Sequence, residues 1–325
     1  MNFDAGEGLK NIQKMITTTP EFHSTGLVSE SDNLRPTRTS PVQSEEPYKA
    51  VVFFSLAGGA DTLNFLVPRS GCSKDMYGEY KSVRGELALD ETLLLPIDAT
   101  NSNQVCSSFG LHPNLKRLQS LYNANDLSFI ANIGVLKEYA TKDNWKDLTD
   151  YTALFSHNEQ QREVQRQDIY DQQGGRGVGG RILDVLGAKG FKANGISTEG
   201  SKDALISNET PLLVLSSVDN YDKLDPMSSD KIGPEDDPDK FISKMKELNK
   251  STKLGSNLLA ETYSSILNSG LAENQLLYDA LQNDMITTTF PETRIGKQLS
   301  TISTMMATRN IRGVDRDVFF VGKFK

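Results

Sequence analysis

Residues 48–68 read YKAVVFFSLAGGADTLNFLVP, and the first part of this stretch decides the fold. Ala50–Leu56 is a nearly continuous run of apolar side chains, many of them β-branched or aromatic. Such a run predicts a strand that is buried on both faces, as strands at the centre of a parallel sheet are. The two glycines at positions 58 and 59 end the run, and they allow a tight turn or the close approach of a ligand.

Two polar residues, Asp61 and Asn64, follow this strand at once. We expect them in the loop at its carboxyl end, which is the edge where open α/β sheets bind ligands. An acidic side chain in that position can bind a metal or act as an acid or base. Alternatively, Asp61 caps the next helical element by accepting backbone hydrogen bonds.

The rest of the chain predicts an α/β fold with a mainly parallel sheet flanked by helices. Residues 1–47 are polar and predict an extended or disordered lead-in, and residues 48–325 form the folded domain. Helical spacing of apolar residues predicts helices over 115–122 and 179–188 and a mostly helical segment over 241–310. Short apolar runs predict strands at 127–133, within 191–217 and at 318–321, and residues 69–110 are expected to form a long connection.

Composition limits the function classes. The 325 residues carry a formal net charge of −8, which argues against a nucleic-acid-binding protein and against adhesion to anionic membranes. No apolar run approaches the ~18 residues that a membrane span needs, and no signal-peptide pattern is visible at the start. A negative balance still permits a local positive pocket, so anionic small molecules or esters remain candidate ligands.

Cys72 and Cys106 are the only cysteines. If they are joined, the disulfide closes a loop of about 33 residues, which the chain-entropy model values at roughly 3–4 kcal/mol. If they are not joined, both are free buried thiols. The sequence leaves these two possibilities open.

The segment Ser156-His157-Asn158-Glu159 marks the start of a helix. Ser156 is a favoured N-cap residue, and Glu159 three residues later completes a capping box. The same position also presents free backbone N–H groups and the positive end of the helix dipole to an anion. Ser156 is therefore a candidate nucleophile or anion ligand, with His157 and Asn158 beside it. His157 is not expected to act as base for its neighbour, because adjacent helical side chains project in different directions.

Residues 174–180 read GGRGVGG and satisfy the spacing of a dinucleotide-binding loop. That motif requires a preceding strand, whereas the preceding residues QREVQRQDIYDQQ are polar. We therefore interpret the glycines as a loop before the helix at 179–188.

The segments GGADTLN and FLVP resemble the signature of a family catalogued as domain of unknown function 1501. This family is grouped with the alkaline phosphatase and sulfatase superfamily. Further segments are similar to the family: Tyr77, Tyr80, Val83 and Arg84 in the pattern Y-x-x-Y-x-x-V-R, the GLHP at 110–113, the SH at 156–157, and Arg181.

The resemblance implies an exported, metal-dependent hydrolase of phosphate or sulfate esters. In this chain it implies Asp61 as ligand of a divalent metal and Ser156 as a nucleophile that the metal activates. Asn64, Arg84 and Asn158 would contact the anionic substrate, since a guanidinium suits phosphate and sulfate oxygens. Alternatively, Arg84 forms a surface ion pair. The family also has metal-binding Asp and His residues beyond the position of Gly322, where this sequence ends in Lys-Phe-Lys. We therefore expect a domain that is incomplete on its C-terminal side.

Two functions from different classes follow from these observations. The first is the metal-dependent ester hydrolase, with a divalent metal of unknown identity as cofactor. The second is a non-catalytic extracellular or surface protein that keeps the scaffold for binding or assembly. The second hypothesis is favoured by the shortage of histidines, because none of the three has a metal-binding spacing.

Overall fold

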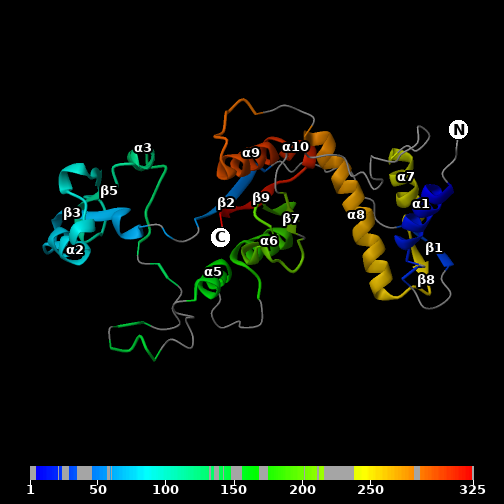
Figure 1. Cartoon of the computed structure of the whole chain (residues 1–325), viewed down its shortest axis with the longest axis horizontal. Helices are drawn as coiled ribbons and strands as arrows, with labels where there is room; N and C mark the ends of the chain where they lie inside the picture. The colour runs from blue at the N-terminus through cyan, green and yellow to red at the C-terminus, as the bar shows by residue number, and fades with distance from the viewer. Residues whose placement is uncertain are drawn as a thin grey trace. The chain divides into compact units, whose positions relative to one another are not determined.

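The computed structural model describes residues 5–20, 22–23, 29–34, 46–56, 59, 61–131, 133–134, 139–141, 143–147, 156–167, 175–200, 202–210, 212–215, 238–281 and 286–323. The chain divides into two compact units, of which unit 1 comprises Met1–Ser55 and Ala153–Lys323. Unit 2 comprises Leu56–Thr152 and Phe324–Lys325, and its described residues all lie within 56–147. Figure 1 shows the helices and strands of both units.

The core of unit 1 is a four-stranded sheet in the order β2-β9-β6-β7. Its strands are β2 (Lys49–Leu56), β6 (Ala193–Ser197), β7 (Leu212–Val214) and β9 (Arg316–Lys323). β6 pairs in parallel with both β7 and β9. β2 runs the same way, because Lys49 N bonds Asp315 O at its start and Gly322 lies against Ser55 O near its end. The predicted α/β class with a parallel sheet flanked by helices is confirmed.

Helices cover both faces of this sheet, with α9 (Arg294–Ala307) on one side and α6 (Val178–Ala188) on the other (Figure 1). Phe319 and Val321 of β9 pack with Ile302 and Met305 of α9 in one apolar cluster. Val318, which directly precedes Phe319, points to the opposite face, where it approaches Gly179 of α6. The central, fully buried strand is therefore β9.

The prediction that Ala50–Leu56 is buried on both faces was wrong. The run does form strand β2, but β2 stands at the end of the sheet order, and Phe54 and Leu56 are 47% and 61% exposed. An apolar run shows that a strand can be buried, whereas its position in the sheet depends on which strands pair with it. Here β9 pairs on both sides and occupies the centre.

A buried ion pair lies at the amino end of β9. Arg312 precedes the strand in the short helix α10 (Arg309–Arg312), and its Nη2 donates to Asp317 Oδ2 at 2.6 Å. The side chains of Arg312 and Asp317 are 5% and 0% exposed. The Tyr48 hydroxyl donates to the same carboxylate oxygen at 2.6 Å. This cluster ties the start of β2 to β9 and to α10.

The second part of unit 1 is formed by segments that are far apart in the sequence. It contains α1 (Ala5–Thr17), β1 (Ser29–Leu34), α7 (Pro238–Leu248), β8 (Ser251–Leu254) and α8 (Leu258–Leu281). β1 and β8 pair antiparallel, and Met15 of α1 packs against the buried residues Phe241, Ile242, Met245 and Leu271. Residues 1–47 were expected to be an extended or disordered lead-in, so strand β1 was not predicted, nor was β8 within the helical segment 241–310.

Unit 2 contains a three-stranded antiparallel sheet in the order β3-β5-β4. Its elements are β3 (Leu66–Cys72), α2 (Met76–Arg84), β4 (Leu95–Asp98), β5 (Cys106–Leu111) and α3 (Lys116–Asn123). Cys72 and Cys106 face each other across β3 and β5, and their sulfurs are bonded. Residues 69–110 therefore form a sheet and not the expected connection. The described part of 127–133 contains no strand, and Ile130 and Ile133 are exposed.

The glycine-rich segment before α6 makes a close backbone contact. A Cβ on Gly180 would lie 1.6 Å from Ile206 O, and one on Gly177 would lie 1.9 Å from Asp203 O. Arg181 donates to Arg166 O and Arg176 O, which holds the start of the helix in place. The glycines thus let α6 approach the loop after β6, in agreement with our interpretation of them as a structural loop.

This contact gives a matched pair of substitutions within one helix. Gly180→Ala is expected to lower the free energy of unfolding by about 1–3 kcal/mol, because its methyl group would overlap a backbone carbonyl. Gly187→Ala meets nothing within 4 Å, and it is expected to be neutral or to stabilise by up to about 1 kcal/mol through helix propensity. Urea unfolding followed by circular dichroism measures both. Equal effects of the two variants would contradict the packing argument.

Candidate functional site

Three of the predicted site residues, Asp61, Asn64 and Arg84, lie together in unit 2. Asp61 precedes the short 3-10 helix η1 (Thr62–Asn64), and Arg84 ends α2. Arg84 Nη2 donates to Asp61 Oδ2 at 2.5 Å, and Asn64 Nδ2 donates to the same oxygen at 2.9 Å. The Asp61 side chain is 47% exposed and that of Arg84 is 15% exposed, so the carboxylate lies at the surface with the guanidinium beneath it.

Two tyrosines connect this cluster to the turn after α2. The Tyr80 hydroxyl donates to Asn64 Oδ1 at 2.7 Å and accepts from Leu89 N at 2.8 Å. The Tyr77 hydroxyl donates to Leu89 O at 2.8 Å, and Asn64 Nδ2 also donates to Leu87 O at 3.0 Å. The two tyrosines of the Y-x-x-Y-x-x-V-R pattern thus have a structural role, because they fasten Asn64 of η1 and the backbone of Leu89 to α2. The substrate-binding roles of Asn64 and Arg84 stay predictions.

A divalent metal does not fit the Asp61 carboxylate as it is arranged. A cation bound there would lie beside the Arg84 guanidinium, and like charges at that distance repel. Metal sites also need several ligands. Among the described residues, no three His, Cys, Asp or Glu side chains are grouped closely enough to hold one. The contacts of Asp61 are those of a structural ion pair.

Ser156, His157 and Asn158 belong to unit 1, at the start of α5 (His157–Arg166). Ser156 is the N-cap, and its hydroxyl accepts from Glu159 N at a long 3.4 Å. In a capping box the Glu159 carboxylate would bond the backbone N–H of Ser156. Here it bonds Arg162 instead, one turn later. His157 and Asn158 are exposed, and no described residue bonds either side chain. The Ser156 hydroxyl is therefore only weakly held.

Sequence reasoning missed a polar cluster where β6 ends. Arg294 Nη2 donates to both carboxylate oxygens of Glu199, at 2.5 and 2.7 Å, and Gln298 Nε2 donates to Glu199 Oε2 at 2.7 Å. Gln298 Oε1 is buried, and no described residue donates to it. The carboxyl ends of parallel strands are the ligand-binding edge of such sheets, so this cluster offers an acceptor to an N–H or O–H group. Glu199 lies just after β6, but GISTEG at 195–200 was predicted as a strand, so Glu199 was not recognised as a residue at a strand end.

Comparison with known proteins found no relative of this chain. The chain matches no protein-family model, no curated protein and no solved structure. Among the described helices, none combines the length and apolar character needed to cross a membrane. The residue groups around Asp61, Ser156 and Glu199 are therefore the structural basis for assigning a function.

Proposed function

We propose that this protein is related to the metal-dependent hydrolases of phosphate and sulfate esters, and that its described residues act as a non-catalytic binding scaffold. The relationship is supported by the GGADTLN resemblance and by the gathering of Asp61, Asn64 and Arg84. The non-catalytic part of the proposal rests on one observation, which is that the Asp61 carboxylate bonds the Arg84 guanidinium. The residue that the resemblance implies as a metal ligand is thus already neutralised by a side chain.

An exported location forms part of this proposal. The family resemblance implies export, and the Cys72–Cys106 bond supports it. Disulfides persist in oxidising compartments and are rare where thiols are kept reduced. The ligand proposed for the scaffold is an anionic small molecule or ester, as the resemblance implies.

Ester hydrolysis is the second candidate function, and the position of Ser156 favours it. A hydroxyl at the first turn of a helix lies beside free backbone N–H groups, which stabilise a bound anion. The long contact to Glu159 N leaves this hydroxyl free to rotate toward a substrate. His157, which is exposed on the same turn, could then bind an oxygen of the ester.

Metal content and ester hydrolysis of the full-length protein distinguish the two candidates. The purified chain is incubated with zinc, calcium or manganese, freed of excess ion and analysed by mass spectrometry, and hydrolysis of p-nitrophenyl phosphate and p-nitrophenyl sulfate is followed. We expect no stoichiometric metal and no turnover, both for the unmodified chain and for Asp61→Ala.

Asp126→Ala is the matched control, since Asp126 is an exposed aspartate of unit 2 outside the cluster. Stoichiometric metal that is lost in Asp61→Ala but kept in Asp126→Ala would overturn the non-catalytic proposal. Turnover that disappears in Ser156→Ala, with the circular dichroism spectrum unchanged, would establish hydrolysis instead.

A further inference from the structure

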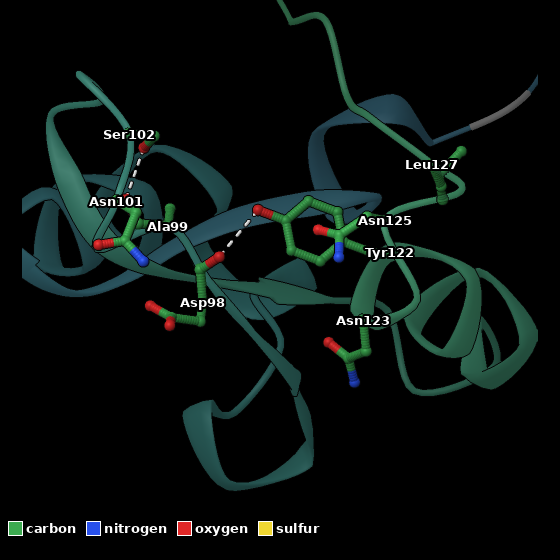
Figure 2. A pocket seen from close by; sticks show the side chains of 8 residues that line it. All are labelled: Asp98, Ala99, Asn101, Ser102, Tyr122, Asn123, Asn125 and Leu127. Atoms are coloured by element: carbon green, nitrogen blue, oxygen red, sulfur yellow. Dashed lines mark hydrogen bonds between the residues drawn. The ribbon is translucent and has the colours of Figure 1, made fainter.

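A separate hollow lies in unit 2, between the end of β4 and the end of α3. It has a volume of about 630 Å³, which is within the usual range for small-molecule sites. Six of its lining residues are polar: Asp98, Asn101, Ser102, Tyr122, Asn123 and Asn125. Figure 2 shows Asp98 and Asn101 on one side of the hollow and Asn123 on the other, with Tyr122 reaching across.

The frame of this hollow is held by several contacts. The Tyr122 hydroxyl donates to Asp98 O at 2.8 Å, and Gln119 Nε2 donates to Pro96 O at 2.7 Å, so two hydrogen bonds fix α3 to β4. Ala99 N donates to Ser107 O at 2.8 Å, which fixes the side of the hollow that follows β4 to β5. The disulfide then joins β5 to β3. The positions of the lining residues are therefore set before a ligand arrives.

The lining groups offer both donors and acceptors. No described residue bonds the side-chain amides of Asn101, Asn123 and Asn125, and each amide supplies an acceptor oxygen and an N–H₂ donor. Asp98 Oδ1 accepts from Thr100, and the second carboxylate oxygen is left to accept from a ligand. These Thr100 hydrogen bonds lower the pKa of Asp98 from its ordinary value, so the carboxylate stays ionised near neutral pH.

We propose that this hollow binds a neutral saccharide. Each sugar hydroxyl is both a donor and an acceptor, and a lining of amides, one carboxylate and one phenol matches that character. The Tyr122 ring stacks on Phe129 at 5.8 Å, which orients it as a rigid apolar surface for the C–H face of a sugar ring.

Other ligand classes match the hollow less well. Among the described residues that line it there is no Lys or Arg and one Asp, so a phosphate or sulfate group would be repelled and left without a cationic partner. Ala99 and Leu127 are the only aliphatic residues in the described lining, which is too little apolar surface for a lipid or a steroid. A single carboxylate is also too few for a calcium site. The site is distinct from the Asp61 cluster, so its test is independent of the proposed function.

The test is a binding measurement on the full-length protein. Saturation-transfer NMR screens cellobiose, maltose, chitobiose, mannose and galactose, with glucose 6-phosphate and inorganic phosphate as charged probes, and calorimetry gives the affinities. We expect at least one neutral sugar to bind with a dissociation constant of about 1 mM or below. The double variant Asn101→Ala/Asn123→Ala is expected to weaken this binding by about tenfold or more, because ligand hydroxyls lose their partners.

Asn103→Ala is the matched control, because Asn103 is exposed in the same loop but does not line the hollow. It should leave the affinity unchanged. The proposal fails if no neutral sugar binds, if the charged probes bind and the neutral sugars do not, or if Asn103→Ala weakens binding as much as the double variant does.

Discussion

Replacing Asp317 with asparagine is expected to lower the free energy of unfolding of unit 1 by about 3–5 kcal/mol. The substitution keeps the volume of the side chain but removes its charge, which leaves the buried Arg312 guanidinium without a counter-ion. It also presents an N–H₂ group where the Tyr48 hydroxyl now donates. Removing one partner of a buried ion pair costs far more stability than replacing the whole pair with apolar residues. Urea unfolding followed by far-ultraviolet circular dichroism measures the loss.

Tyr48→Phe is the control for this prediction. It removes one hydrogen bond to Asp317 and leaves the ion pair intact, so the expected loss is only about 0.5–1.5 kcal/mol. Burial, followed by the negative charge of Asp317, raises the pKa of Tyr48 above its ordinary value of 10.0. The unfolded chain therefore releases this proton at a lower pH than the native protein, and stability falls as the pH rises above 10. Tyr48→Phe should lose less stability over this range. Equal losses for Asp317→Asn and Tyr48→Phe at neutral pH would contradict the ion-pair argument.

Removal of the disulfide by Cys72→Ala/Cys106→Ala is expected to destabilise unit 2 by about 3–4 kcal/mol. The bond joins β3 to β5, and β5 is the middle strand of the three-stranded sheet. Unit 2 has a small core, because its buried apolar residues are few: Val67, Leu94, Ile97, Ala99, Cys106 and Leu111. A cross-link therefore supplies a large share of the stability of this unit. Trp145 lies in unit 2, and its fluorescence reports unfolding.

A reducing agent provides the companion measurement, since the chain has no other cysteines. Dithiothreitol should shift the fluorescence transition of unit 2 as the double variant does. It should leave the unfolding transition of unit 1, followed by circular dichroism, unchanged, because unit 1 contains no cysteine. An equal shift of both transitions would show that the two units unfold as one, and no shift in either would show that the bond contributes little.

Much of unit 1 could be predicted from the sequence. The strands at 193–197, 212–214 and 316–323, and the helix at 178–188, all fall where apolar spacing predicted them. The burial of individual residues was less predictable. Within the predicted helix at 179–188, Leu183 is buried whereas Val185 is 55% exposed. Spacing along one helix defines an apolar stripe, but the neighbouring elements decide which edge of that stripe is covered.

Unit 2 was predicted less well, for a physical reason. Its strands contain polar residues and are short, as in LPID and CSSFGL, and the antiparallel pairing of β3 with β5 joins residues 34 to 45 positions apart. Asp61 and Arg84 could be placed in one site only through the family resemblance. Glu199 and Gln298 are 99 positions apart, so no local pattern connects them.

The position of β9 has a consequence for how the protein is made. β9 lies between β2 and β6 in the sheet, yet it follows every other described strand in the chain. During translation, β2 and β6 therefore leave the ribosome long before the strand that pairs with both of them exists. The sheet of unit 1 can close only when β9 emerges, and the exposed apolar side chains of β2 would meanwhile be open to chaperones. The sheet of unit 2 lies wholly within residues 66–111, so it can form while the ribosome is still translating the later part of unit 1.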